Sequence, residues 1–422
     1  MTTTIIALGL LYFIGHWLTH FFNRTKVPDV LILIVFGMLL GPIFHIVDPA
    51  NIGRAGELFT AVALIIILFE SGLDLELSTL RRSAGLATKL TVSTFFATAF
   101  IIFAILYWGF GYSPMAGLVM GFICGGTSSA VVIPLVGALK VGKKAATMLI
   151  LESVLTDVLC IIFALGVLAS IYSGEIEVGR IIGNLISSLV FALVIGILGG
   201  ILWIRILEYV RNWTHTQFAT FAFMFIVYGV ADLLHFSGPI AALAFGIWLG
   251  NYKTLEHRIS FLSNSLKTNT DHIVVVSDAE KKLYKEIVFL LKIFFFVYLG
   301  ISIPIEHVYT AGVASCIVMA VYLMRPIVTK IVVGKHISAY DNTIVSIMVP
   351  KGLAAAVLAG LPSQYGMIEG ADIQAFTYNV ILISIILTSV LIPIINRTTL
   401  GGIMMRFFGN DEKTSEEVSN DD

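Results

Sequence analysis

Residues 146–171 read ATMLILESVLTDVLCIIFALGVLASI, an apolar stretch that carries two acidic residues, Glu152 and Asp157. A helix needs about 20 apolar residues to cross the hydrocarbon core of a bilayer, and this stretch is long enough. Acidic side chains within such a helix are costly, so they usually face a cavity or an opposite charge and mark an ion or substrate pathway. The stretch therefore predicts a membrane-spanning helix with a functional acid.

The composition extends this prediction to the whole chain. Of its 422 residues, 58% are hydrophobic and 13% are charged, whereas soluble domains carry about 25% charged residues. A bilayer must replace water around much of the surface, so we expect an all-α, multi-pass membrane protein. The formal net charge of −1 argues against nucleic acid as a partner, because a polyanion requires a basic surface.

Apolar segments recur along almost the entire chain and predict about 13 transmembrane helices. Turn or charge signals, such as Gly111-Tyr112-Ser113-Pro114, separate them. The predicted spans lie near residues 4–22, 28–44, 56–75, 86–108, 113–138, 146–171, 179–204, 217–235, 238–251, 285–303, 309–333, 342–361 and 372–396.

Basic residues set the expected orientation. With the N-terminus outside, almost every loop Lys and Arg falls on the cytoplasmic side, and the external loops hold only Arg54 and Arg180. Cytoplasmic loops carry this excess in membrane proteins, so we expect the N-terminus outside and the C-terminus inside a plasma or inner membrane. Residues 1–410 form the predicted transmembrane domain, with a polar linker or surface helix at 252–284. The acidic residues 411–422 read as a disordered cytoplasmic tail.

Two spans contain signals that interrupt a helix. The fifth contains Gly125-Gly126-Thr127-Ser128-Ser129-Ala130, and the twelfth contains Pro350-Lys351-Gly352. Broken backbone at membrane depth is tolerated only where it is buried or lines a cavity. Two interruptions in corresponding, inverted halves are the best sequence indication of a transporter site. The alternative for the fifth span is a continuous helix whose small residues allow close packing.

The two acids of residues 146–171 point in different directions. Glu152 and Thr156 are four residues apart and share a helix face, whereas Asp157 lies about 100° further round. We expect Asp157 to meet the substrate and Glu152 to have a structural role. The alternative is that buried cations merely neutralise both.

Three basic residues lie within predicted spans: Lys292, Arg325 and Lys351. Lys351 can neutralise one interrupted helix end or pair with Glu152. Arg325 cannot lose its charge and needs an acidic or carbonyl partner, unless it reaches the interface as an extended side chain. Lys292 has the same interfacial alternative.

Enzyme signatures are missing from the sequence. It has no Walker phosphate loop, no His-Glu-x-x-His run and no paired cysteine cluster. We therefore expect a transporter rather than an enzyme, with no cofactor.

Several segments, in order, resemble the monovalent cation:proton antiporters, the sodium/proton antiporter superfamily, and most closely its electroneutral branch. Glu152-Ser153-Val154-Leu155-Thr156-Asp157 resembles the Glu-Ser-Leu-Leu-Asn-Asp signature of that branch. The other matching segments are residues 27–42, Leu68 to Leu75, Ser237-Gly238-Pro239 to Asn251, Phe294 to Gly300, Arg325-Pro326 and Pro350-Lys351-Gly352.

The resemblance implies two inverted repeats with two crossed, interrupted helices. It implies a homodimer in which a core domain, spans about 86–171 and 309–396, moves like an elevator. The core would move against a dimerisation panel, spans about 4–75 and 217–303, with 179–204 as a linker helix.

The resemblance also assigns roles to residues. Asp157 is the carboxylate that binds either a proton or a monovalent metal cation. Thr156 occupies a position where electrogenic members carry Asp and many electroneutral members carry Asn, and Arg325 replaces a frequent titratable lysine. Both replacements remove a titrating group, so we expect one cation to exchange for one proton. Two positions depart from the electroneutral branch, which usually has arginine at Lys351 and often glutamate at Lys292.

Burial disfavours the charged form of a carboxylate, so a proton and a partly dehydrated cation can compete for Asp157. The candidate oxygen donors around it are Thr127, Ser128, Ser129, Ser153 and Thr156. We expect a cation/proton antiporter for Na⁺ or K⁺, with Li⁺ as a further candidate. The alternatives are a sodium-coupled symporter of an organic solute and, more remotely, a cation channel.

Overall fold

The computed structural model of the chain describes residues 9–10, 12–17, 28–47, 49–75, 77–139, 141–172, 178–211, 213, 216–252, 276–303 and 308–409. Three segments with sequence-based predictions lie largely or wholly outside the described residues. They are much of the first span, most of the polar stretch 252–284, and the tail 411–422.

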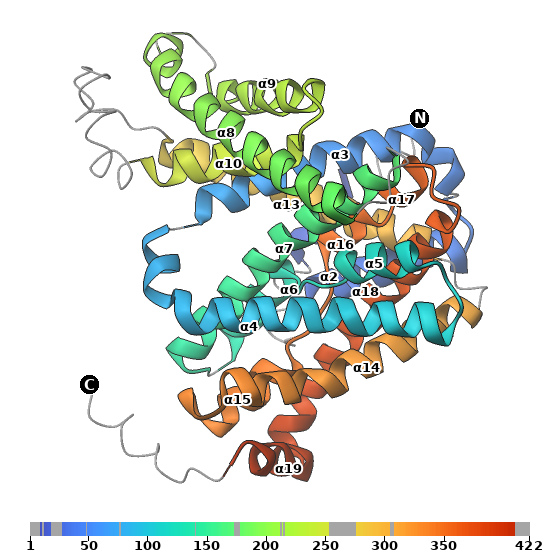
Figure 1. The fold of residues 1–422 in the computed structure, drawn as a ribbon. Coiled ribbons are helices and arrows are strands. Elements are labelled where there is room, and N and C mark those ends of the chain that lie inside the picture. Colours follow the sequence, from blue (N-terminus) through green and yellow to red (C-terminus); the bar gives the residue numbers. More distant parts are fainter. Residues whose placement is uncertain are drawn as a thin grey trace, which may run out of the picture. The chain divides into compact units, whose positions relative to one another are not determined.

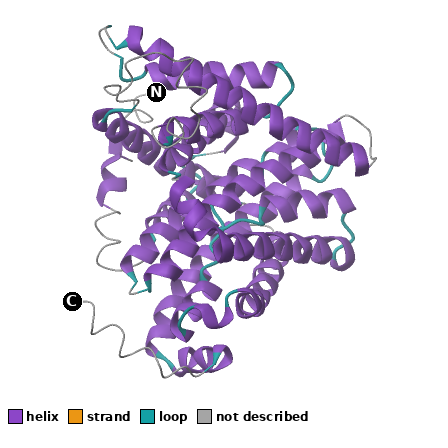
Figure 2. Cartoon of the chain, turned by 60° about the vertical axis from the view of Figure 1, so that its left-hand side comes forward, coloured by secondary structure: helices purple, strands orange, loops and turns teal. Residues whose placement is uncertain are grey.

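Regular structure in the described residues is helical throughout, without strands (Figure 2). This agrees with the all-α prediction, and helices cover the predicted spans from 28–44 onward. In chain order they are α2 (Asp29–Met38), η1 (Leu39–Ile43), α3 (Pro49–Asp74), α4 (Leu77–Ala104), η2 (Ile105–Gly109), α5 (Pro114–Ile123), α6 (Ser129–Ala138), α7 (Lys143–Tyr172), α8 (Val178–Val210), α9 (Ala219–Leu233), α10 (Gly238–Gly250), α13 (Asp278–Ser302), α14 (Val308–Val332), η4 (Gly334–His336), α15 (Ala339–Ile347), α16 (Leu353–Leu358), α17 (Leu361–Gln364), α18 (Gly370–Arg397) and α19 (Thr399–Phe408).

Five stretches of these helices are long and apolar enough to cross a membrane. They are Gly85–Gly109, Lys143–Leu168, Ile186–Leu207, Val308–Val332 and Gly370–Ile395. Short polar signals fix several helix starts. The Ser113 hydroxyl accepts a hydrogen bond from the Ala116 amide at 3.2 Å and caps α5, and the Ser338 hydroxyl caps α15 in the same way through Asp341 at 3.0 Å.

The chain divides into two compact units. One unit comprises residues 52–82 and 165–295 and contains α8, α9 and α10, which pack on one another. Glycines allow its helices to approach closely. A β-carbon added at Gly196 of α8 would lie 2.6 Å from the β-carbon of Ala244 on α10, so a larger residue would force these two helices apart.

The other unit comprises residues 1–51, 83–164 and 296–422. It contains most of α4, the short helices α5, α6, α15 and α16, and the long helices α14 and α18, which pack together (Figure 1). The two acids and the two predicted interruptions all belong to this unit, which therefore holds the candidate site.

Candidate functional site

Both predicted helix interruptions are present. α5 ends at Ile123 and α6 begins at Ser129, with non-helical backbone between them, and α15 and α16 are separated in the same way by residues 348–352. The sequence explains both breaks. Gly125-Gly126 gains little from a helical conformation, and Pro350 has no amide hydrogen to donate and disfavours helix in the residue before it.

The two breaks touch each other. The Ser128 amide donates a hydrogen bond to the Pro350 carbonyl oxygen at 2.7 Å. Gly352 makes this approach possible, because a β-carbon there would lie 3.0 Å from the Ser128 α-carbon and closer still to the Ser128 side chain. Two interrupted helices from distant parts of the sequence therefore cross at their breaks.

Lys351 lies at this crossing and is 2% exposed. Its ammonium donates to the Gly126 carbonyl oxygen at 2.8 Å, just beyond the C-terminal end of α5. Free carbonyls give a helix C-terminus a partial negative charge, which a cation stabilises. The backbone amide of Lys351 also donates to the Ser384 hydroxyl of α18 at 2.9 Å, which connects the second break to a long helix.

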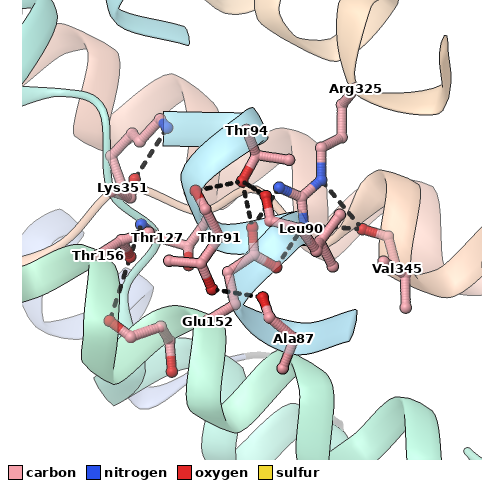
Figure 3. Close-up of polar contacts among 12 residues, drawn as sticks. Ala87, Leu90, Thr91, Thr94, Thr127, Glu152, Thr156, Arg325, Val345 and Lys351 are labelled. Carbon is pink, nitrogen blue, oxygen red and sulfur yellow. Dashed lines mark hydrogen bonds and ion pairs between the residues drawn. The ribbon is translucent and has the colours of Figure 1, made fainter. Parts of the chain in front are cut away.

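Lys351 does not pair with Glu152, which corrects one of the two expectations for it. Glu152 is bonded instead to Arg325 of α14. The guanidinium donates from Nη2 to Glu152 Oε2 at 2.6 Å and from Nη1 to Oε1 (Figure 3). A planar guanidinium matches both carboxylate oxygens at once, which a lysine ammonium cannot do.

The Glu152–Arg325 pair is part of a buried network. Glu152 is 1% exposed and Arg325 is 2% exposed. The Thr94 hydroxyl of α4 donates to Glu152 Oε1 at 2.8 Å, and Arg325 also donates to the Val345 carbonyl oxygen of α15 at 3.3 Å. Four helices, α4, α7, α14 and α15, meet in this network (Figure 3).

Asp157 lies on the same helix as Glu152 but in a different setting. It is half-buried, and its Oδ2 accepts a hydrogen bond from the Ser129 hydroxyl at 3.1 Å. Ser129 is the first residue of α6. Amides at a helix N-terminus carry a partial positive charge that favours a nearby anion. Ser129 thus brings Asp157 to the start of one half of the interrupted helix.

Of the other four predicted oxygen donors, Thr127 and Ser128 lie in the break, Thr156 is bonded to it, and Ser153 bonds within α7. The Thr156 hydroxyl accepts from the Thr127 amide at 3.0 Å and donates to the Ser153 carbonyl oxygen at 3.2 Å, so it steadies the break (Figure 3). The Ser153 hydroxyl donates within its own helix, to Ile150 at 2.9 Å. The Ser128 hydroxyl is buried and has no hydrogen-bond partner among the described residues.

Two residues that donate or accept hydrogen bonds in the site were not predicted from the sequence. Thr94 and Ser384 are ordinary residues inside apolar spans. One signal was available for Thr94, because Thr91, Thr94 and Thr98 follow one face of the predicted span 86–108, and all three are buried. Ser384 offered no pattern, since its role depends on a chain reversal that brings it to residue 351.

The arrangement can bind a small cation without a conventional metal cluster. No group of three His, Cys, Asp or Glu side chains suited to a metal occurs in the part of the chain that the structure describes. What the crossing offers is one carboxylate, nearby hydroxyls, and carbonyls released by broken helices. Such sets hold monovalent cations and protons in transporters.

Comparison with known proteins agrees with this geometry. The profile of the family described as "Sodium/hydrogen exchanger, transmembrane" matches residues 9–398. Na(+)/H(+) antiporter 1 of Methanocaldococcus jannaschii is 22% identical over 363 residues, which cover 83% of this chain and 81% of that protein. The K(+)/H(+) antiporter NhaP of Alkalimonas amylolytica is 26% identical over 171 residues, or 39% of this chain and 30% of that protein.

The fold has a solved counterpart. The structure of the sodium proton antiporter MjNhaP1 from Methanocaldococcus jannaschii at pH 8 aligns with a TM-score of 0.74 and 21% identity, covering 97% of this chain and 99% of that one. The fold is therefore the antiporter fold. With a family match over nearly its whole length, this chain belongs to the transmembrane sodium/hydrogen exchanger family, a family of transporters rather than enzymes.

Proposed function

We propose that this protein exchanges a monovalent cation, Na⁺ or K⁺, for a proton across the membrane, with Asp157 as the shared binding site. The observation that carries the proposal is the crossing of two interrupted helices beside a carboxylate bonded to Ser129 at the start of α6. Names of similar proteins include both sodium and potassium antiporters, and the transport assay below compares Na⁺, K⁺ and Li⁺.

Competition for one carboxylate couples the two ions. A proton neutralises Asp157 directly, and a partly dehydrated cation does so if oxygen ligands replace its lost water. The candidate ligands are the Ser129 and Ser128 hydroxyls and the backbone carbonyls at residues 124, 125 and 127. The Gly126 carbonyl accepts from Lys351, and the Ser128 carbonyl accepts from amides of α6. The empty, charged carboxylate is costly to carry through the membrane, so the site crosses mainly when loaded, which prevents leakage of either ion.

We further propose that exchange is electroneutral, one cation for one proton. Thr156 has no ionisable proton, and Arg325 keeps its charge at all physiological pH values. Glu152 is already paired with the Arg325 guanidinium. Asp157 is then the acid left to alternate between the two substrates.

We also propose alternating access by an elevator motion, which the family resemblance supports. In this proposal, spans 86–171 and 309–396 form the moving core and spans 4–75 and 217–303 form the panel of a homodimer, connected by the helix at 179–204. The protein lies in the plasma or inner membrane with its N-terminus outside and its C-terminus in the cytoplasm, as the distribution of Lys and Arg favours.

The direct test is transport by Asp157→Asn in proteoliposomes. The protein is reconstituted with an inside-acidic pH gradient, and Na⁺, K⁺ or Li⁺ is added separately while internal pH is followed. Wild type should dissipate the gradient with at least one cation, and Asp157→Asn should not, because an amide can neither bind a proton nor neutralise a cation.

A matched control is Asp232→Asn, which changes the same chemical group at an exposed position of α9. It should transport like wild type. Normal cation-dependent proton flux in Asp157→Asn would refute the assignment. Cation uptake that requires an organic solute would indicate a symporter instead, and a unitary conductance would indicate a channel.

A further inference from the structure

α19 follows the last long helix and exposes an apolar face. Ile403 is 62% exposed and Phe407 is 43% exposed, and they lie four residues apart on one side of the helix. The opposite side packs on α15 and α18 (Figure 1). The face exposed by Ile403 and Phe407 is called the α19 face below.

This face continues the outer surface of a membrane-spanning helix. Along α14, Leu323, Ile327 and Ile331 form an exposed apolar row at four-residue spacing. At the end of α14, the Lys330 ammonium donates to the Phe407 carbonyl oxygen at 2.5 Å and lies 4.1 Å from the centre of the Phe407 ring. The exposed apolar row of α14 therefore ends beside α19.

Exposed cations lie on α19, at the end of α14, in the following η4 turn and at the start of α7. They are Lys143, Lys144, Lys330, Lys335 and Arg406. The Lys144 ammonium donates to the His336 carbonyl oxygen at 3.1 Å, which brings the start of α7 beside the loop that follows α14. These five residues, called the basic rim below, belong to one compact unit of the fold.

The segments that carry the basic rim contain almost no acidic residues. Within residues 139–147, 327–347 and 397–409 the sequence contains a single acid, Asp341. Its carboxylate is buried and accepts a hydrogen bond from the Gly142 amide at 3.0 Å. The exposed charge on these three segments is therefore positive.

An exposed apolar face flanked by exposed cations, next to a transmembrane helix, has the chemistry of a surface that binds anionic lipid. We propose that the α19 face and the basic rim bind the anionic headgroup layer of the bilayer, with Ile403 and Phe407 inserted at the acyl boundary. In the orientation proposed above, this end meets the cytoplasmic leaflet, where anionic lipids make the surface negative. Because α19 packs on α15, bound lipid would also stabilise the first half of the second interrupted helix.

The test is lipid binding by the purified full-length protein. The protein in detergent is titrated with phosphatidylglycerol or phosphatidylcholine, and retained lipid is counted by native mass spectrometry. Wild type should prefer phosphatidylglycerol, and 0.5 M salt should weaken that preference because exposed charges are screened. The triple variant Lys330→Gln, Lys335→Gln, Arg406→Gln should lose affinity for phosphatidylglycerol by roughly fivefold per cation removed.

Two further variants separate lipid binding from damage to the fold. Lys143→Gln, Lys144→Gln, Lys335→Gln leaves the Lys330–Phe407 contact intact and should also lose affinity. Arg205→Gln, Lys281→Gln, Lys282→Gln removes the same charge from exposed positions of the other unit and should bind like wild type.

Three outcomes would overturn the proposal. One is equal binding of the two lipids by wild type, and another is unchanged phosphatidylglycerol affinity in both rim variants. The third is a preference that appears only in a chain that stops at Asn410, because the acidic tail, rather than lipid, would then be the partner of the basic rim.

Discussion

Glu152 and Asp157 are acids five residues apart on α7, yet their surroundings differ completely. Both oxygens of Glu152 are occupied by Arg325, and Thr94 adds a further bond. Asp157 receives one hydrogen bond from the described residues, from Ser129. The comparison supports the proposal that one helix carries a structural acid at Glu152 and a substrate-binding acid at Asp157.

The physical reason is the cost of burying charge. A carboxylate removed from water must be offset by an opposite charge and by hydrogen bonds. At Glu152 an ion pair and a hydrogen bond from Thr94 provide this compensation. At Asp157 the described residues provide one hydrogen bond, and in the proposed mechanism a proton or a cation supplies the rest.

The largest expected effect is on stability, at the Glu152 end. Glu152→Gln should lower the free energy of unfolding by about 3–5 kcal/mol, because Arg325 would remain buried without its counter-charge. Asp157→Asn should change stability by less than about 1 kcal/mol, since it removes a half-buried charge with one neutral donor. Thermal unfolding of both variants in the same detergent measures the difference.

A double variant, compared with its two single variants, tests whether the ion pair is the cause of this loss of stability. Glu152→Leu with Arg325→Met removes both charges and should recover most of the stability that either change loses alone. If the double variant is instead the sum of the two single losses, the guanidinium and carboxylate are not coupled and the comparison fails.

A smaller effect is expected at the other end, from Ser129→Ala. Losing a hydrogen bond to a charged group costs about 1.5 kcal/mol or more, so the apparent cation affinity should change by roughly tenfold while turnover persists. The initial rate of pH-gradient dissipation against cation concentration gives this value. Ser315→Ala is the matched control and should leave the affinity unchanged, because this exposed hydroxyl of α14 donates to the Ala311 carbonyl of its own helix.

The smallest expected effect is that of membrane potential on the transport rate, which should not change. If Glu152 stays ionised and Asp157 alone titrates, the loaded site carries the same charge with either substrate. Transport in proteoliposomes should then be insensitive to an imposed potential set with K⁺ and valinomycin, measured with Na⁺ as substrate. A rate that rises with the potential would mean that a second group releases its proton.

The sequence predicted much of this site. Gly125-Gly126 and Pro350 indicated two helix breaks, and both are present. The spacing of Glu152 and Asp157 indicated two different directions, which agrees with their separate partners. These features are local, because backbone conformation and helical periodicity depend on a few neighbouring residues.

The cation that pairs with Glu152 could not be predicted from the sequence in the same way. Arg325 and Lys351 were both available cations, and the expectation that Lys351 can pair with Glu152 was wrong. Which cation reaches the acid depends on how α14 and the second break pack beside α7. The bonds from Thr94 and Ser384 also join residues far apart in sequence.

The sequence by itself therefore determined that this is a helical membrane protein with two broken helices and a costly acid in its interior, because apolar length, helix-breaking residues and buried charge are properties of short segments. Only the tertiary structure decided which charges compensate one another and that the two breaks touch through Ser128 and Pro350. The reason is that hydrogen bonds and ion pairs act over a few ångströms, so their partners are fixed only when distant helices are packed side by side.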